Sequence, residues 1–125
     1  MSWILPEELE NAERFERELQ SEREEARQIL LNIELVDRVE FTNCMIPLQI
    51  HAFLSTGEMC YGRNSRVGGD VTMWVFEKEC DLAKEWPPIL FKGERASDAG
   101  NYTILALEML SLIKDYLNHK EQLPS

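Results

Sequence analysis

The chain has 125 residues, enough for one domain (residues 1–125) with its own core, and 44% of them are apolar, which argues against disorder. Its net charge of −10 at pH 7 repels phosphate backbones, so nucleic acid is not expected as a partner. No segment has the roughly 20 continuous apolar residues of a membrane span, and the opening MSWILPEELE lacks the basic flank and apolar length of a signal peptide. We therefore expect a soluble, cytoplasmic protein without a membrane partner.

A long acidic helix is expected over residues 6–35. Pro6 followed by Glu7 and Glu8 is typical of a helix start, because proline tolerates the first helical position and acids complement the positive end of the dipole. Apolar residues then recur at helical spacing, with Glu22 at one position of the stripe. The stripe consists of Ala12, Phe15, Leu19, Ala26, Ile29 and Ile33. Residues 7–40 hold 12 acids and five arginines, so most of the net charge lies here.

An antiparallel sheet of three to four strands is expected over residues 46–91. Residues 46–54 alternate between apolar and mixed positions, which is typical of a half-buried strand. Residues 70–78 are rich in β-branched and aromatic side chains, and the stretch ILF at 89–91 offers one more short strand. Residues 36–45 are compatible either with an extra strand or with an extended connection.

The glycine-rich stretch CYGRNSRVGGDV, residues 60–71, comes nearest to a ligand-binding motif. Its spacing matches neither GxxxxGK[ST] nor a GxGxxG that opens a helix, so a phosphate site is disfavoured. Gly68 and Gly69 predict instead a two-residue hairpin turn, since glycine adopts positive φ without strain.

The expected hairpin fixes which side chains meet across its two strands. With Gly68 and Gly69 at the tip, Arg63 pairs with Trp74 and Tyr61 pairs with Phe76. That register places the guanidinium of Arg63 on the indole of Trp74, an attractive cation–π arrangement. The arginine then has a structural use that does not require a ligand.

A final helix is expected over residues 102–119, where apolar side chains cover much more than one stripe. Ser97, Asp98 and Asn101 can each cap its N-terminus, and His119 suits the negative end of its dipole. The whole pattern predicts an α+β fold: a long N-terminal helix, an antiparallel meander of three to four strands, and a C-terminal helix packed on the sheet.

Metal and nucleophile chemistry were considered for Cys44, His51, Cys60 and Cys80. None of them belongs to a CxxC or HxxxH pair, the spacing that normally presents two zinc ligands from one turn. Three widely spaced cysteines suit reduced thiols, and a Cys–His nucleophile pair needs an orienting third group. We expect no structural metal and no cofactor.

The concentration of acids on the first helix favours a non-enzymatic protein-binding domain, such as an inhibitor, immunity protein, adaptor or secretion chaperone, that docks a basic partner protein. The same helix also offers a surface for a homo-oligomer. The residues expected to meet the partner flank the apolar stripe: Glu13, Glu16, Glu18, Glu24 and Glu25.

The alternative is a small enzyme or ligand-binding domain with a pocket between the sheet and the C-terminal helix. Polar and aromatic residues of the predicted sheet region could line such a pocket. The candidates are His51, Arg63, Arg66, Trp74 and Trp86. The chain contains no catalytic motif, and for this reason the binding domain is favoured over the enzyme.

Overall fold

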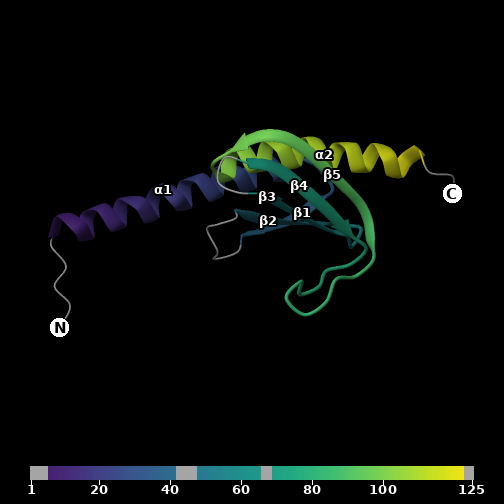
Figure 1. Ribbon diagram of the computed structural model, residues 1–125, viewed down its shortest axis with the longest axis horizontal. Helices are drawn as coiled ribbons and strands as arrows, with labels where there is room; N and C mark the ends of the chain where they lie inside the picture. The colour runs from purple at the N-terminus through teal and green to yellow at the C-terminus, as the bar shows by residue number, and fades with distance from the viewer. Residues whose placement is uncertain (1–5, 42–47, 66–68, 123–125) are drawn as a thin grey trace.

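A five-stranded antiparallel sheet with two helices makes up the part of the chain that the computed structural model describes, residues 6–41, 48–65 and 69–122 (Figure 1). The strands are ordered as in the sequence, so each one pairs with the next in a meander. The elements are α1 (Pro6–Leu31), β1 (Val36–Phe41), β2 (Gln49–Leu54), β3 (Met59–Asn64), β4 (Gly69–Phe76), β5 (Ile89–Ala99) and α2 (Tyr102–Gln122). The α+β class is confirmed, but the strand count is five, not three to four.

The boundaries differ from the sequence-based expectation mainly at the edges of the sheet. Residues 36–41 of the ambiguous segment form the edge strand β1, and α1 ends four residues early because the backbone turns at residues 32–35. At the other edge, β5 is 11 residues long instead of three. It therefore includes Ser97 and Asp98, and Asn101 caps α2: its Oδ1 accepts a hydrogen bond from the Ile104 N–H at 2.8 Å.

The predicted register of the β3–β4 hairpin is wrong by two residues. Tyr61 pairs with Trp74 and Arg63 with Thr72, because the Ser65 N–H donates to the Asp70 carbonyl at 2.8 Å and leaves a longer connection than two glycines. Gly69, one of the two predicted tip residues, is instead the first residue of β4, and Gly68 lies outside the described residues. The expected cation–π contact is nevertheless present across the diagonal, with the Arg63 guanidinium 5.0 Å from the centroid of the Trp74 ring.

Helix α2 and the C-terminal half of α1 cover one face of the sheet and form the main core with it. Tyr102, Leu105 and Met109 are fully buried along α2. The helix approaches β3 so closely that a Cβ added at Gly62 would lie 2.4 Å from the Met109 sulfur. A side chain at this position would displace Met109, so glycine permits the close approach of helix and sheet.

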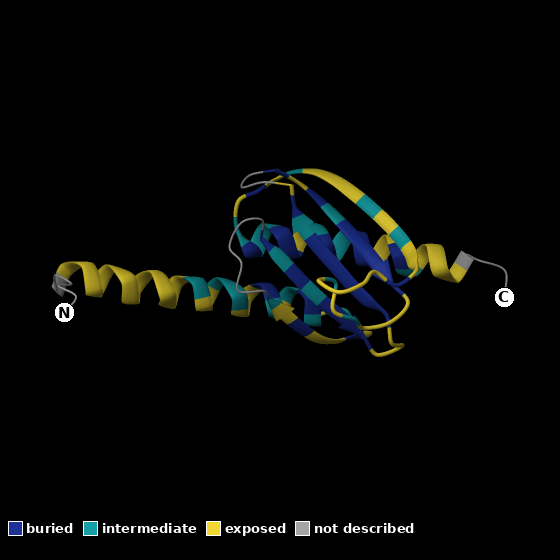
Figure 2. Cartoon of the chain, turned by 60° about the horizontal axis from the view of Figure 1, so that its bottom comes forward, coloured by how far each residue is buried: buried dark blue, intermediate teal, exposed yellow. Residues whose placement is uncertain are grey.

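The opposite face of the sheet carries a second, aromatic cluster of Phe53, Met59, Tyr61, Trp74 and Phe76. No helix covers this cluster in the part of the chain described; the connection between β4 and β5, residues 77–88, folds over it instead (Figure 2). Cys80 and Leu82 from this connection pack against the cluster. One face of the sheet is therefore covered by the two helices, and the other, aromatic face is covered by the connection between β4 and β5.

The N-terminal half of α1 extends away from the sheet, whereas its C-terminal half packs beside α2 (Figures 1 and 2). Leu9 and Phe15 are 51% and 52% exposed, although Ala26 and Leu30 further along the helix are fully buried. One helix thus changes from a core element to a projecting element along its own length.

Candidate functional site

The glutamates predicted to meet a partner are all exposed on α1. Helical geometry places Glu18 and Glu25 on one side of the apolar stripe, and Glu13, Glu16 and Glu24 on the other side and the back. They therefore flank the stripe without forming one continuous acidic face. Hydrogen bonds donated by Gln28 and Arg27 lower the pKa of the Glu24 carboxyl from its ordinary value. Glu24 therefore already has hydrogen-bond partners within α1.

The apolar stripe of α1 leads from the projecting half of the helix into a groove at the body of the protein. Ala12 and Phe15 are exposed, Leu19 is half-buried and Ala26 is buried, so the stripe enters the core gradually. A groove of about 200 Å³ lies at the point where the helix leaves the body. It is lined by Phe15, Glu18, Leu19, Glu22, Leu48, Gly100 and Tyr102.

Glu22, which interrupts the apolar stripe, has a structural partner. Its Oε1 accepts the N–H of Tyr102, the first residue of α2. That N–H has no acceptor within its own helix, and a carboxylate also complements the positive end of the dipole. The Glu22 side chain therefore links α1 to the N-terminus of α2 by a hydrogen bond. The sequence alone did not reveal this role.

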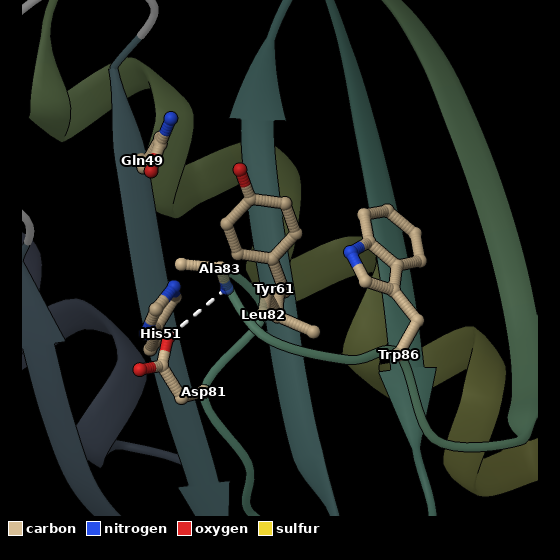
Figure 3. A pocket seen from close by; sticks show the side chains of 7 residues that line it. All are labelled: Gln49, His51, Tyr61, Asp81, Leu82, Ala83 and Trp86. Atoms are coloured by element: carbon tan, nitrogen blue, oxygen red, sulfur yellow. Dashed lines mark hydrogen bonds between the residues drawn. The ribbon is translucent and has the colours of Figure 1, made fainter.

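A second candidate site lies on the aromatic face of the sheet, where residues 81–86 pass over β2 and β3 (Figure 3). We call it the aromatic hollow; it has a volume of about 320 Å³. Its lining consists of Gln49, His51, Tyr61, Asp81, Leu82, Ala83 and Trp86. Tyr61 presents its ring from the sheet and Trp86 from the loop, and His51 and Asp81 come from the sheet and the loop respectively (Figure 3).

His51 is packed between aromatic rings within this hollow. Its ring centroid lies 5.0 Å from that of Tyr61 and 6.4 Å from that of Phe53. Burial lowers the pKa of the imidazole from its ordinary value, and the carboxylate of Glu40, its partner across β1 and β2, opposes this shift only in part. The lowered pKa favours the neutral form of His51 at pH 7.

Some of the residues named for a pocket come together, but on the face of the sheet that α2 does not cover. His51 and Trp86 line the aromatic hollow, and Arg63 and Trp74 stack next to each other on the same face. That face lies away from α2, because the space between the sheet and α2 is filled by the main core. Arg66 lies outside the described residues. Sequence reasoning missed Tyr61 and Asp81, which reach the hollow through long-range packing.

The two described cysteines, Cys60 and Cys80, are arranged unfavourably for a shared metal ion and for nucleophilic chemistry. Cys60 belongs to the core under α2, whereas Cys80 packs against the aromatic cluster, so the two lie on opposite faces of the sheet and cannot share one ion. Burial raises the pKa of the Cys60 thiol to about 12, which keeps it protonated at neutral pH. Burial, Glu85 and Asp81 raise the pKa of Cys80 as well. Cys44 lies outside the described residues.

A buried carboxylate that the sequence did not reveal ties α2 to the turn between β2 and β3. Glu58 accepts hydrogen bonds from Thr56, from the Tyr116 hydroxyl at 2.5 Å and from the Lys120 ammonium at 3.0 Å. Burial is the largest single influence and opposes ionisation, but the three donors together outweigh it and lower the pKa of Glu58. Burial, together with the hydrogen bond to Glu58, raises the pKa of Tyr116 well above its ordinary value.

Comparisons with protein-family models, with curated proteins and with solved structures found no match for this chain. Neither helix among the described residues is both long and apolar enough to cross a lipid bilayer. The exposed surface of α1 and the aromatic hollow are the two candidate sites in the described part of the chain.

Proposed function

We propose that the protein is a non-enzymatic binding domain that docks a basic partner protein through the projecting half of α1. The observation that carries this proposal is the exposure of Leu9 and Phe15 on the half of α1 that projects from the body of the protein (Figure 2). An isolated helix of this length is only marginally stable in water, and exposed apolar side chains gain free energy when a partner covers them.

The charge around these apolar residues supports a basic partner over a second copy of the chain. Residues 6–20 contain six glutamates and two arginines, so two such helices side by side would repel each other. A partner that combines an apolar groove with lysines or arginines on its rim would match both the stripe and the glutamates that flank it. The groove beside Tyr102 extends the same surface onto the body of the protein.

A photo-crosslinking experiment tests the proposal. A benzophenone amino acid replaces Phe15 in the full chain, and a control chain carries it at Lys114, which is exposed on α2. We expect a crosslinked protein of basic isoelectric point from position 15 that is absent from position 114. Lysine at Glu13, Glu16 and Glu18 should abolish this product.

Three outcomes would contradict the proposal. The first is a crosslinked partner that is itself acidic. The second is a product that forms equally from both positions, which would indicate non-specific capture. The third is a covalent dimer of the chain with itself, which would instead favour a homo-oligomer through α1.

A further inference from the structure

The aromatic hollow is a second candidate binding site, separate from the surface of α1. We propose that it binds an organic cation, an alkylammonium or guanidinium group, between the rings of Tyr61 and Trp86 and the carboxylate of Asp81. A cation of this kind is attracted by the negative faces of aromatic rings and by a nearby carboxylate at the same time.

The chemistry of the lining favours a cation over an anion. The seven described residues that form the hollow include one carboxylate, Asp81, and neither a lysine nor an arginine. Burial lowers the pKa of His51, the imidazole in this lining, which disfavours its cationic form. The net charge of −10 adds a long-range attraction for cations.

The same face of the sheet already pairs its aromatic rings with the chain's own cations. The Arg38 guanidinium lies 4.0 Å from the centroid of the Phe53 ring, and Arg63 and Lys92 lie 5.0 Å and 5.8 Å from that of Trp74. None of these three side chains belongs to the lining of the hollow. They show that this face accommodates ammonium and guanidinium groups on its rings.

The hollow is also held in shape before any ligand arrives. Trp86 packs edge-on against Trp74 and Phe76, with ring centroids 5.8 Å and 5.4 Å apart. Asp81 Oδ1 accepts the Ala83 N–H at 3.0 Å, and the Asp81 carbonyl accepts the Lys84 N–H at 3.0 Å. A site fixed in this way loses little conformational entropy on binding.

Choline and 3,3-dimethylbutan-1-ol form a matched pair of probes, because they share a shape and only choline is charged. Titrations followed by NMR of the Trp86 indole should show saturable choline binding with a dissociation constant in roughly the millimolar range, and binding of the alcohol about tenfold weaker. Two further probes distinguish the source of the cation: Nα-acetyl-trimethyllysine methylamide and Nα-acetyl-arginine methylamide. Tighter binding of either indicates a protein side chain, and tighter binding of choline indicates a free small cation.

Two variants decide whether the carboxylate acts as proposed. Asp81→Asn keeps an oxygen that can accept the Ala83 N–H but removes the charge, so choline binding should weaken several-fold while the alcohol is unaffected. Glu85→Gln, an equally exposed change in the same loop outside the hollow, should leave both affinities unchanged. Equal affinities for choline and the alcohol, a choline response that survives unchanged in Asp81→Asn, or no response of Trp86 to any of the cations would overturn the proposal.

Discussion

Helices α1 and α2 have 26 and 21 residues, but they place their apolar side chains in different surroundings. In α2, Leu105, Met109 and Ile113 are fully buried against the sheet. In the first half of α1, Leu9 and Phe15 remain about half exposed. Apolar side chains therefore support the fold in α2 and form an exposed surface on the first half of α1.

This difference indicates where substitutions should affect stability and where they should affect binding. A buried apolar side chain contributes its transfer free energy and its packing to the folded state. An exposed one contributes little until a partner covers it. The four variants below test this division, from the largest expected change in the free energy of unfolding to the smallest.

Leu105→Ala should have the largest effect. Leu105 is fully buried in the core under α2, so truncation removes apolar contacts and leaves a cavity. We expect a loss of about 2–5 kcal/mol in the free energy of unfolding, measured by urea denaturation. A loss below about 1 kcal/mol would mean that α2 does not pack as described.

Tyr116→Phe should destabilise the protein by about 1.5–3 kcal/mol at pH 7, because it removes a hydrogen bond to the buried carboxylate of Glu58. The folded-state pKa of Glu58 is lowered, so its contribution is present above its ordinary pKa of 4.5 and is lost as the pH falls through the folded value. The difference between variant and wild type should therefore shrink in acid. Urea denaturation at several pH values measures it, and a difference that stays constant down to pH 3 would contradict this account.

Glu22→Ala removes the acceptor for the first N–H of α2 and should cost about 1 kcal/mol, the typical contribution of a helix cap. Glu25→Ala, three residues along the same helix but exposed, is the matched control and should stay within about 0.5 kcal/mol of wild type. Thermal denaturation of both variants separates the two roles. Equal effects would show that Glu22 acts only as surface charge.

Phe15→Ala should have the smallest effect on the fold, within about 0.5 kcal/mol, because half of the side chain is already in water. The same variant should weaken binding to the protein that crosslinks at position 15. Denaturation measures the free energy of unfolding, and titration calorimetry on the same preparation measures the affinity for the partner. A clear loss of stability with unchanged binding would mean that Phe15 supports the fold and does not contact the partner.

Helical periodicity was enough to predict α1 and α2 from the sequence, because apolar residues at three- and four-residue spacing must share a face. Strand β5 was missed beyond residue 91, since Lys92, Glu94 and Arg95 resemble a polar loop. As an edge strand it is held by backbone hydrogen bonds to β4, which do not require an apolar side-chain pattern. The hairpin register was missed because two glycines favour a tight turn that the Ser65–Asp70 hydrogen bond replaces.

The surface of α1 could be predicted from the sequence, whereas the aromatic hollow could not, because only the first depends on local spacing. The exposure of the α1 glutamates follows from composition and helical spacing. The aromatic hollow depends on which face of the sheet the helices cover and on a loop that returns over β2 and β3, and both are long-range properties. His51 and Trp86 were therefore named without their neighbours Tyr61 and Asp81. They were expected to face α2, and they lie on the opposite face of the sheet.

The most direct test of the binding surface on α1 is the association rate constant of the protein that crosslinks at position 15, measured by stopped flow at low and high salt. One variant carries lysine at Glu13, Glu16, Glu18, Glu24 and Glu25. A matched variant with the same net charge carries lysine at exposed acids elsewhere: Glu77, Glu85, Glu94, Asp115 and Glu121. If α1 steers the basic partner, the first variant should associate at least about tenfold more slowly at low salt, the second should stay close to wild type, and high salt should reduce the difference. Equal slowing of both variants, or no slowing of the first, would contradict the account.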